Sequence, residues 1–228
     1  VAGGIIFTTS ADKRRRSKWP GGLLRLRARR PGPALSHPAR SSSIRLIWAN
    51  VSPQFKVGFF LSNLQEAALA YARRGWPIFP CRVDKTPYVE HGVLDATTDE
   101  AVVAGWWERW PGANVALAVG DAGLLVIDYD PGSDEAEVRN ALGGAPPVTR
   151  LSARTPRGGR HDYYLLPRGT EPVASSSGRF AAHVDVRSFH GYVLLPPART
   201  ADGAYEWTSE GKPAAASEAL LSACRAAR

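Results

Sequence analysis

The chain has 228 residues, with 29 Lys and Arg against 21 Asp and Glu, and a formal net charge of +8. Its hydrophobic content of 44% excludes a chain that is disordered throughout, and the lack of an apolar run of about 18 residues excludes a membrane-spanning helix. Cys81 and Cys224 lie far apart and belong to no CxxC or Cys/His cluster, which argues against a disulfide framework and a zinc site and makes a reducing cytoplasm the expected location.

The positive charge is concentrated in residues 1–60. This segment holds twelve bases and one acid, whereas the remainder holds 17 bases against 20 acids. Pro, Gly and Ser interrupt every regular period there, so we expect a basic, disordered extension over 1–60 and a folded domain over 61–228. The extension is interpreted as a nucleic-acid-binding arm, a solvated tail, translated sequence outside the native protein, or a segment resembling a transit peptide.

From Asn63 onward the sequence alternates between helix and strand signals. The expected helices are 63–74, 97–110, 133–142 and 217–226, and the expected strands are 76–80, 114–119, 123–128, 149–154, 162–166, 183–187, 192–195 and 205–207. A capping-box-like Asn63–Glu66 starts the first helix, and the apolar runs 114–119 and 123–128 predict adjacent strands in the middle of a sheet. The tryptophans at 106, 107 and 110 are assigned to the core, with base stacking as the alternative. The pattern predicts an α+β fold with a mixed or antiparallel central sheet and flanking helices.

The first candidate site lies where the strand 123–128 ends in Asp128-Tyr-Asp130-Pro-Gly. Side chains at positions i and i+2 of a strand point to the same face, so Asp128 and Asp130 present two carboxylates side by side. A divalent cation relieves their repulsion, and oxygen ligands suit Mg²⁺ or Mn²⁺. A simple turn that Asp130 caps is the alternative interpretation.

The second candidate site is the segment Thr155-Pro-Arg157-Gly158-Gly159-Arg160-His161. Its two glycines allow the backbone to approach a ligand closely, and its two arginines and its histidine are phosphate-binding residue types. The GK[ST] element of a Walker A loop is absent, so a basic hairpin turn is the other interpretation.

A third acid, Asp185, lies on a predicted strand between apolar neighbours, where an unpaired carboxylate is unfavourable. Either it forms a salt bridge with a base such as Arg187, or it completes a three-carboxylate cluster with Asp128 and Asp130 that can hold two metal ions. In combination, the strand-borne acids and the Arg/His hairpin favour a phosphoryl-transfer site. Lys85 is either a solvated loop lysine or a contact to the template or triphosphate.

These motifs, with AALAYARRGWPIFPCR before them and VDVRSFHGYVLLPP after them, resemble the N-terminal domain of bifunctional DNA primase/polymerases over residues 64–207. The resemblance implies an archaeo-eukaryotic primase-like fold with an RRM-like portion, and a prim-pol catalytic domain over 61–228. It also implies metal-dependent nucleotidyl transfer, an activity of the EC 2.7.7 type.

Site residues follow from the same resemblance. Asp128, Asp130 and Asp185 match the catalytic metal ligands for two Mg²⁺ or Mn²⁺ ions; His161 matches the phosphate-contacting histidine; Arg160, Gly158 and Gly159 belong to the same motif, and Arg157 is added as a further nucleotide-binding residue. Two departures from the family pattern are the loop after Asp185, which is poorer in Gly and Asp, and Asp162, which we expect to perturb His161.

The expected function is therefore synthesis or extension of DNA primers from (d)NTPs on a single-stranded DNA template, in the cytoplasm, without a membrane or an organic cofactor. A separately encoded helicase is a further expected partner. Two alternatives stay open: a primase-fold nucleic-acid-binding module without catalysis, and a DxD metal-dependent glycosyltransferase. The glycosyltransferase accounts for the acid pair but not for Asp185 or the GGRH hairpin.

Overall fold

The computed structural model describes residues 53–226, with side chains from Asn63 onward. Residues 1–52 of the extension predicted over 1–60 lie outside the described residues. The helices are α2 (Pro53–Arg73), the 3-10 helix η2 (Gly92–Asp95), α3 (Glu100–Arg109), α4 (Glu135–Leu142) and α5 (Glu218–Ala226). The strands are β1 (Ile78–Cys81), β2 (Asn114–Ala118), β3 (Leu124–Tyr129), β4 (Leu151–Arg154), β5 (Arg160–Leu165), β6 (Ser176–Ala181), β7 (Val184–Arg187), β8 (Tyr192–Leu194), β9 (Arg199–Thr200), β10 (Gly203–Ala204), β11 (Glu206–Glu210) and β12 (Ala214–Ala215).

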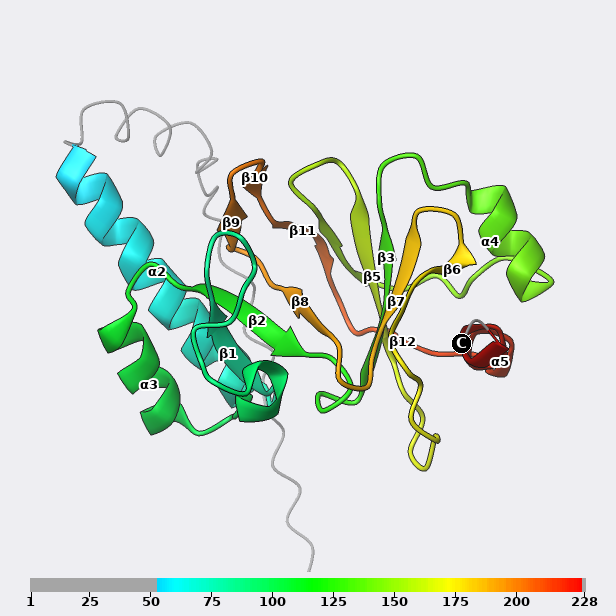
Figure 1. Cartoon of the computed structure of the whole chain (residues 1–228), viewed down its shortest axis with the longest axis horizontal. Coiled ribbons are helices and arrows are strands. Elements are labelled where there is room, and N and C mark those ends of the chain that lie inside the picture. The colour runs from blue at the N-terminus through cyan, green and yellow to red at the C-terminus, as the bar shows by residue number, and fades with distance from the viewer. Residues whose placement is uncertain (1–52, 227–228) are drawn as a thin grey trace, which may run out of the picture. The chain divides into compact units, whose positions relative to one another are not determined.

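These strands form two main sheets, shown in Figure 1. A three-stranded antiparallel sheet has the order β1-β2-β8. A seven-stranded sheet has six antiparallel strands in the order β11-β4-β5-β3-β7-β6. Its seventh strand, β12, pairs parallel to β5. The predicted α+β class with a mixed sheet and flanking helices is confirmed. Within 53–226, no helix combines the length and the hydrophobicity needed to cross a membrane.

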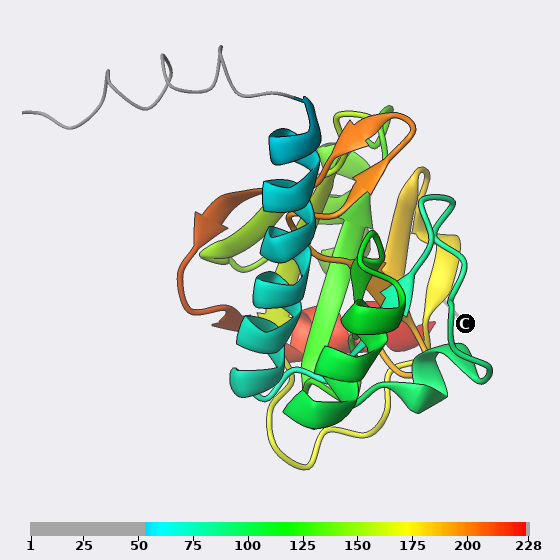
Figure 2. The same cartoon turned by 90° about the vertical axis from the view of Figure 1, so that its left-hand side faces the viewer.

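Strand β3 is buried on both faces because a separate core covers each of them. Leu124 and Val126 belong to a core shared with α2, α3 and β2, whereas Leu125 and Ile127 belong to a core shared with α4, α5 and β7. Figure 2 shows α2 and α3 side by side over their face of the fold, and α4 and α5 lie beyond the seven-stranded sheet in Figure 1. This double coverage explains why 123–128 is a continuous apolar run.

The predicted pairing of 114–119 with 123–128 is wrong, because β2 and β3 belong to different sheets. Between them, the backbone nitrogens of Val119 and Gly120 donate to the carbonyls of Gly191 and Ser188 instead of to β3. A Cβ on Gly120 would lie 2.9 Å from the backbone of Phe189. The chain is therefore held against the segment before β8 and passes from one sheet to the other.

Helix α2 also differs from the prediction, since it begins at Pro53 and contains Asn63 in its interior. Proline is favoured in the first turn of a helix, and this signal outweighs the capping-box pattern. Strand β6 was not predicted because its sequence, SSGRFA, lacks apolar alternation. The core assignment of the tryptophans is supported, because Trp107 is buried and donates from Nε1 to a backbone carbonyl, while the other two pack against the same core.

Candidate active site

His161 of β5, Asp128 of β3 and Asp185 of β7 occupy directly opposed positions on three neighbouring strands. Opposed residues of antiparallel strands project their side chains from the same face, with Cα atoms about 4.5–5.5 Å apart. The fold thus brings the predicted histidine and two predicted acids, which are up to 57 positions apart in the chain, into one row. This juxtaposition depends on the order of the strands.

The centre of the row is a partly buried pair between Asp128 and His161. Nε2 of His161 lies 3.3 Å from Oδ1 of Asp128, and the two side chains are 4% and 18% exposed, respectively. Burial raises the pKa of Asp128, but the hydrogen bond and charge of His161, together with Arg187 and Lys85, outweigh burial and lower that pKa overall. On the other side of the imidazole, the hydroxyl of Tyr163 lies 3.4 Å from Nδ1.

Asp130 follows β3 and pairs with the β4–β5 turn. Its Oδ1 lies 3.1 Å from a guanidinium nitrogen of Arg157. In that turn Gly158 has a φ of +88°, which favours glycine. A Cβ on Gly159 would lie only 2.3 Å from the carbonyl oxygen of Tyr129. The second glycine is thus required for close contact with the end of β3, a reason distinct from the ligand approach that the sequence suggested.

Asp185 accepts hydrogen bonds from three protein groups. Its carboxylate accepts from the guanidinium of Arg187 at 2.5 Å, from the hydroxyl of Ser177 at 3.1 Å and from the backbone nitrogen of Gly178 at 2.9 Å. The salt bridge with Arg187, one of the two explanations offered for this acid, is therefore present. Among the residues whose side chains are described, no three His, Cys, Asp or Glu residues converge into a group that could hold a metal ion.

Each of the three predicted metal ligands thus has a different basic partner. The shared face of Asp128 and Asp185 and their oxygen-only chemistry fit Mg²⁺ or Mn²⁺. In the structure, these side chains are oriented toward His161 and Arg187. Asp128 and Asp130 use only Oδ1 in these ion pairs, whereas both oxygens of Asp185 accept hydrogen bonds from the protein.

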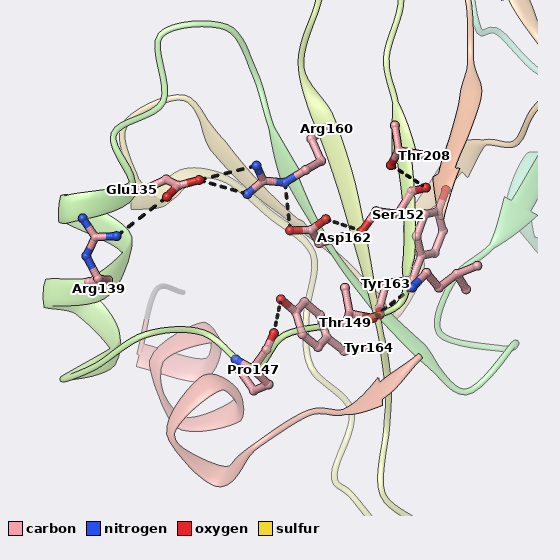
Figure 3. A network of polar contacts seen from close by, with 11 residues as sticks. Glu135, Arg139, Pro147, Thr149, Ser152, Arg160, Asp162, Tyr163, Tyr164 and Thr208 are labelled. Carbon is pink, nitrogen blue, oxygen red and sulfur yellow. Dashed lines mark hydrogen bonds and ion pairs between the residues drawn. The ribbon is translucent and has the colours of Figure 1, made fainter. Parts of the chain in front are cut away.

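Arg160 is not brought to this row. Because side chains alternate along β5, Arg160 and Asp162 share the face opposite to His161. Arg160 Nε lies 2.9 Å from Asp162, its guanidinium lies 3.4 Å from Glu135 of α4, and it stacks 4.3 Å from the ring centroid of Tyr129. Figure 3 shows this network running from Arg139 and Glu135 through Arg160 to Asp162 and Ser152. The expected effect of Asp162 on His161 has no contact to support it.

Two cavities adjoin the Asp128–His161 pair. One, of about 290 Å³, is lined by residues that include Lys85, Arg187, His190 and Tyr205. A smaller one lies between Lys85, Tyr205 and the β4–β5 turn. Tyr205 and His190 were missed by sequence reasoning. An aromatic residue at the start of the predicted strand 205–207 and a histidine beside Gly191 were the only local signals for them.

The family model described as "Bifunctional DNA primase/polymerase, N-terminal" matches residues 68–219, which is more than half of the chain. The match extends from α2 to the start of α5 and includes the whole row and the β4–β5 turn. No curated protein matches the chain.

Proposed function

Because the chain belongs to the bifunctional DNA primase/polymerase N-terminal family, we propose that it transfers nucleotides from (d)NTPs to a 3′-hydroxyl on a single-stranded DNA template. The observation that carries this proposal is the row His161–Asp128–Asp185 across three adjacent strands, at the wall of two cavities. In this proposal the seven-stranded sheet, with α4 and α5, is the RRM-like part of the primase-like fold.

Asp128, Asp130 and Asp185 would hold two Mg²⁺ or Mn²⁺ ions. These ions would activate the attacking hydroxyl and neutralise the leaving pyrophosphate. The chain needs no organic cofactor for this chemistry, and a separately encoded helicase remains a proposed partner.

The bases that now pair with the acids would act on the incoming triphosphate. Where a carboxylate turns toward a metal ion, the donor of its base becomes free to contact a phosphate oxygen. His161 and Arg157 are the proposed phosphate contacts on this ground. Arg160 is left out of the set because it contacts Asp162 and Glu135 on the other face of the sheet.

The decisive experiment is a primer assay with and without a supplied primer, with dNTPs or NTPs, and with Mg²⁺ or Mn²⁺. We expect the wild type to incorporate nucleotides and Asp128→Ala to lose incorporation by at least about a hundredfold, since a ligand of the metal ions and the partner of His161 are removed together. Asp121→Asn, a change at an exposed loop acid, is the control and should keep full activity. Incorporation by Asp128→Ala at the wild-type rate would overturn the assignment.

A second candidate function is nucleic-acid binding without catalysis. It is favoured by one observation, the pairing of every predicted metal ligand with a protein base. Binding of single-stranded DNA without incorporation under either metal would support it. The glycosyltransferase alternative has no support once the chain is placed in the primase/polymerase family.

A further inference from the structure

The cavities beside the acid row are lined, in the part of the chain whose side chains are described, by three Lys or Arg residues. Arg157 pairs with Asp130 and Arg187 pairs with Asp185. The third, Lys85, lines both cavities and makes no ion pair with any described carboxylate. The site therefore contains one cation whose charge is not already matched by an acid.

The backbone of Lys85 is held in place although its side chain is exposed. Its φ of +73° lies in the left-handed region, which is unfavourable for a residue other than glycine. Its nitrogen donates to the carbonyl of Arg82 at 3.0 Å, and its carbonyl accepts from the hydroxyl of Tyr192 at 3.1 Å. The next turn is closed by Asp84, which accepts from the backbone nitrogen and hydroxyl of Thr86.

The side chain of Lys85 faces the catalytic row. Its Nζ lies 5.9 Å from the ring centroid of Tyr205, and that buried ring lies 5.6 Å from the imidazole of His161. An anion bound next to Asp128 and His161 would therefore meet this ammonium group, which offers three donors to phosphate oxygens.

We propose that Lys85 binds the triphosphate of the incoming nucleotide, and that it is the cation of the site that does so before any acid has released its base. The inference rests on the proposed function, which supplies the nucleotide. Arg157 and Arg187 each pair with a carboxylate, whereas the ammonium group of Lys85 pairs with none of the described carboxylates and lies against the ring of Tyr205. A triphosphate is favoured over a template phosphate because Lys85 shares both cavities with Asp128, where the reacting groups would lie.

The test is calorimetric titration of the full chain with inorganic tripolyphosphate, in EDTA at low ionic strength. We expect Lys85→Ala to weaken binding about tenfold, the cost of losing one hydrogen bond to a charged group, and Lys85→Arg to retain most of it. The matched control is Lys212→Ala, which removes an equal charge from an exposed position that lines neither cavity. Both alanine variants should unfold at the wild-type temperature.

Three outcomes would overturn this assignment. Equal weakening by Lys85→Ala and Lys212→Ala would show only an effect of total charge. Unchanged binding of tripolyphosphate by Lys85→Ala would show that Lys85 does not bind phosphate. The proposed function would not be affected, because the primer assay of the wild type tests it separately. Loss of single-stranded oligonucleotide binding alone would make Lys85 a template contact. If Lys85 proves necessary for tripolyphosphate but the wild type incorporates no nucleotide, the anion site stands and the proposed function fails.

Discussion

Replacing Gly159 with alanine tests how the β4–β5 turn is joined to the end of β3. The new Cβ would lie 2.3 Å from the carbonyl oxygen of Tyr129 and 2.9 Å from Oγ1 of Thr155. An ordinary carbon–oxygen contact is about 1 Å longer than the first of these distances, and the atom in the way is backbone, which does not rotate aside. The turn must therefore move by about 1 Å relative to β3. Overpacking of this kind costs about 1–3 kcal/mol of unfolding free energy.

The displacement also separates residues of the proposed site, because Arg157 and His161 lie on one side of the contact and Asp128 and Asp130 on the other. A misplacement of about 1 Å can reduce catalysis about a hundredfold. We expect Gly159→Ala to lower the urea midpoint of unfolding. We also expect it to reduce the rate of Mn²⁺-dependent primer extension about a hundredfold.

The matched control is Gly158→Ala at the neighbouring position. Its φ of +88° makes alanine unfavourable, but no atom lies within 4 Å of the added Cβ, so we expect a cost of about 1 kcal/mol and retained extension. A Gly159→Ala protein that matches the wild type in both stability and extension would refute the reasoning. Equal loss in both variants would mean that backbone conformation, and not the contact with Tyr129, is the cause.

Three further results are expected. Asp128→Ala should lower the unfolding free energy by about 1–3 kcal/mol in thermal melts, because it leaves buried His161 without its carboxylate partner. Asp128→Asn should lower it less, because its amide oxygen can still accept from Nε2. If both variants melt at the wild-type temperature, the Asp128–His161 pair does not stabilise the fold. Cys81 and Cys224 should react slowly with a thiol reagent at pH 8 in the native state, since burial raises the pKa of each to about 12. Because these thiols ionise near 9 once unfolded, stability should fall as the pH rises above 9, and rapid native labelling would contradict this. Deletion of residues 1–52, which removes eleven bases and one acid, should weaken DNA binding and flatten its salt dependence far more than it slows extension of a bound primer; an unchanged salt slope would be evidence against an arm that contacts phosphates.

Much of the fold could be predicted because its signals are local. The helices α3 and α4 lie within the predicted ranges 97–110 and 133–142, and each begins after an aspartate, Asp99 or Asp134, that accepts from backbone nitrogens of the first turn. The strands that carry Asp128, His161 and Asp185 were also placed within one or two residues. Periodicity and capping depend on a few neighbouring residues, so they can be recognised without knowing the rest of the chain.

The arrangement of the candidate site was only partly predictable. The predicted strand 162–166 did not include Arg160 and His161, so both were assigned to one turn. Only the structure shows that they face opposite sides of β5 and that Arg160 contacts Glu135 of α4. The contact of Tyr205 with His161 and the support that Tyr192 provides to Lys85 could not be predicted, because each joins segments about 40 or more positions apart. Such contacts exist only after the strands have been ordered.

The same division between sequence and tertiary structure applies to the charged residues. Composition alone determined that the net charge of +8 arises from residues 1–60, and that the remaining chain is slightly acidic. Spacing alone determined that Asp128 and Asp130 share a strand end and that two glycines make the turn before His161. Tertiary structure decided that β3 lies between β5 and β7, and consequently which acid pairs with which base. That choice depends on competition among strands for neighbours and on the cores that cover both faces of the sheet, which no local stretch of sequence contains.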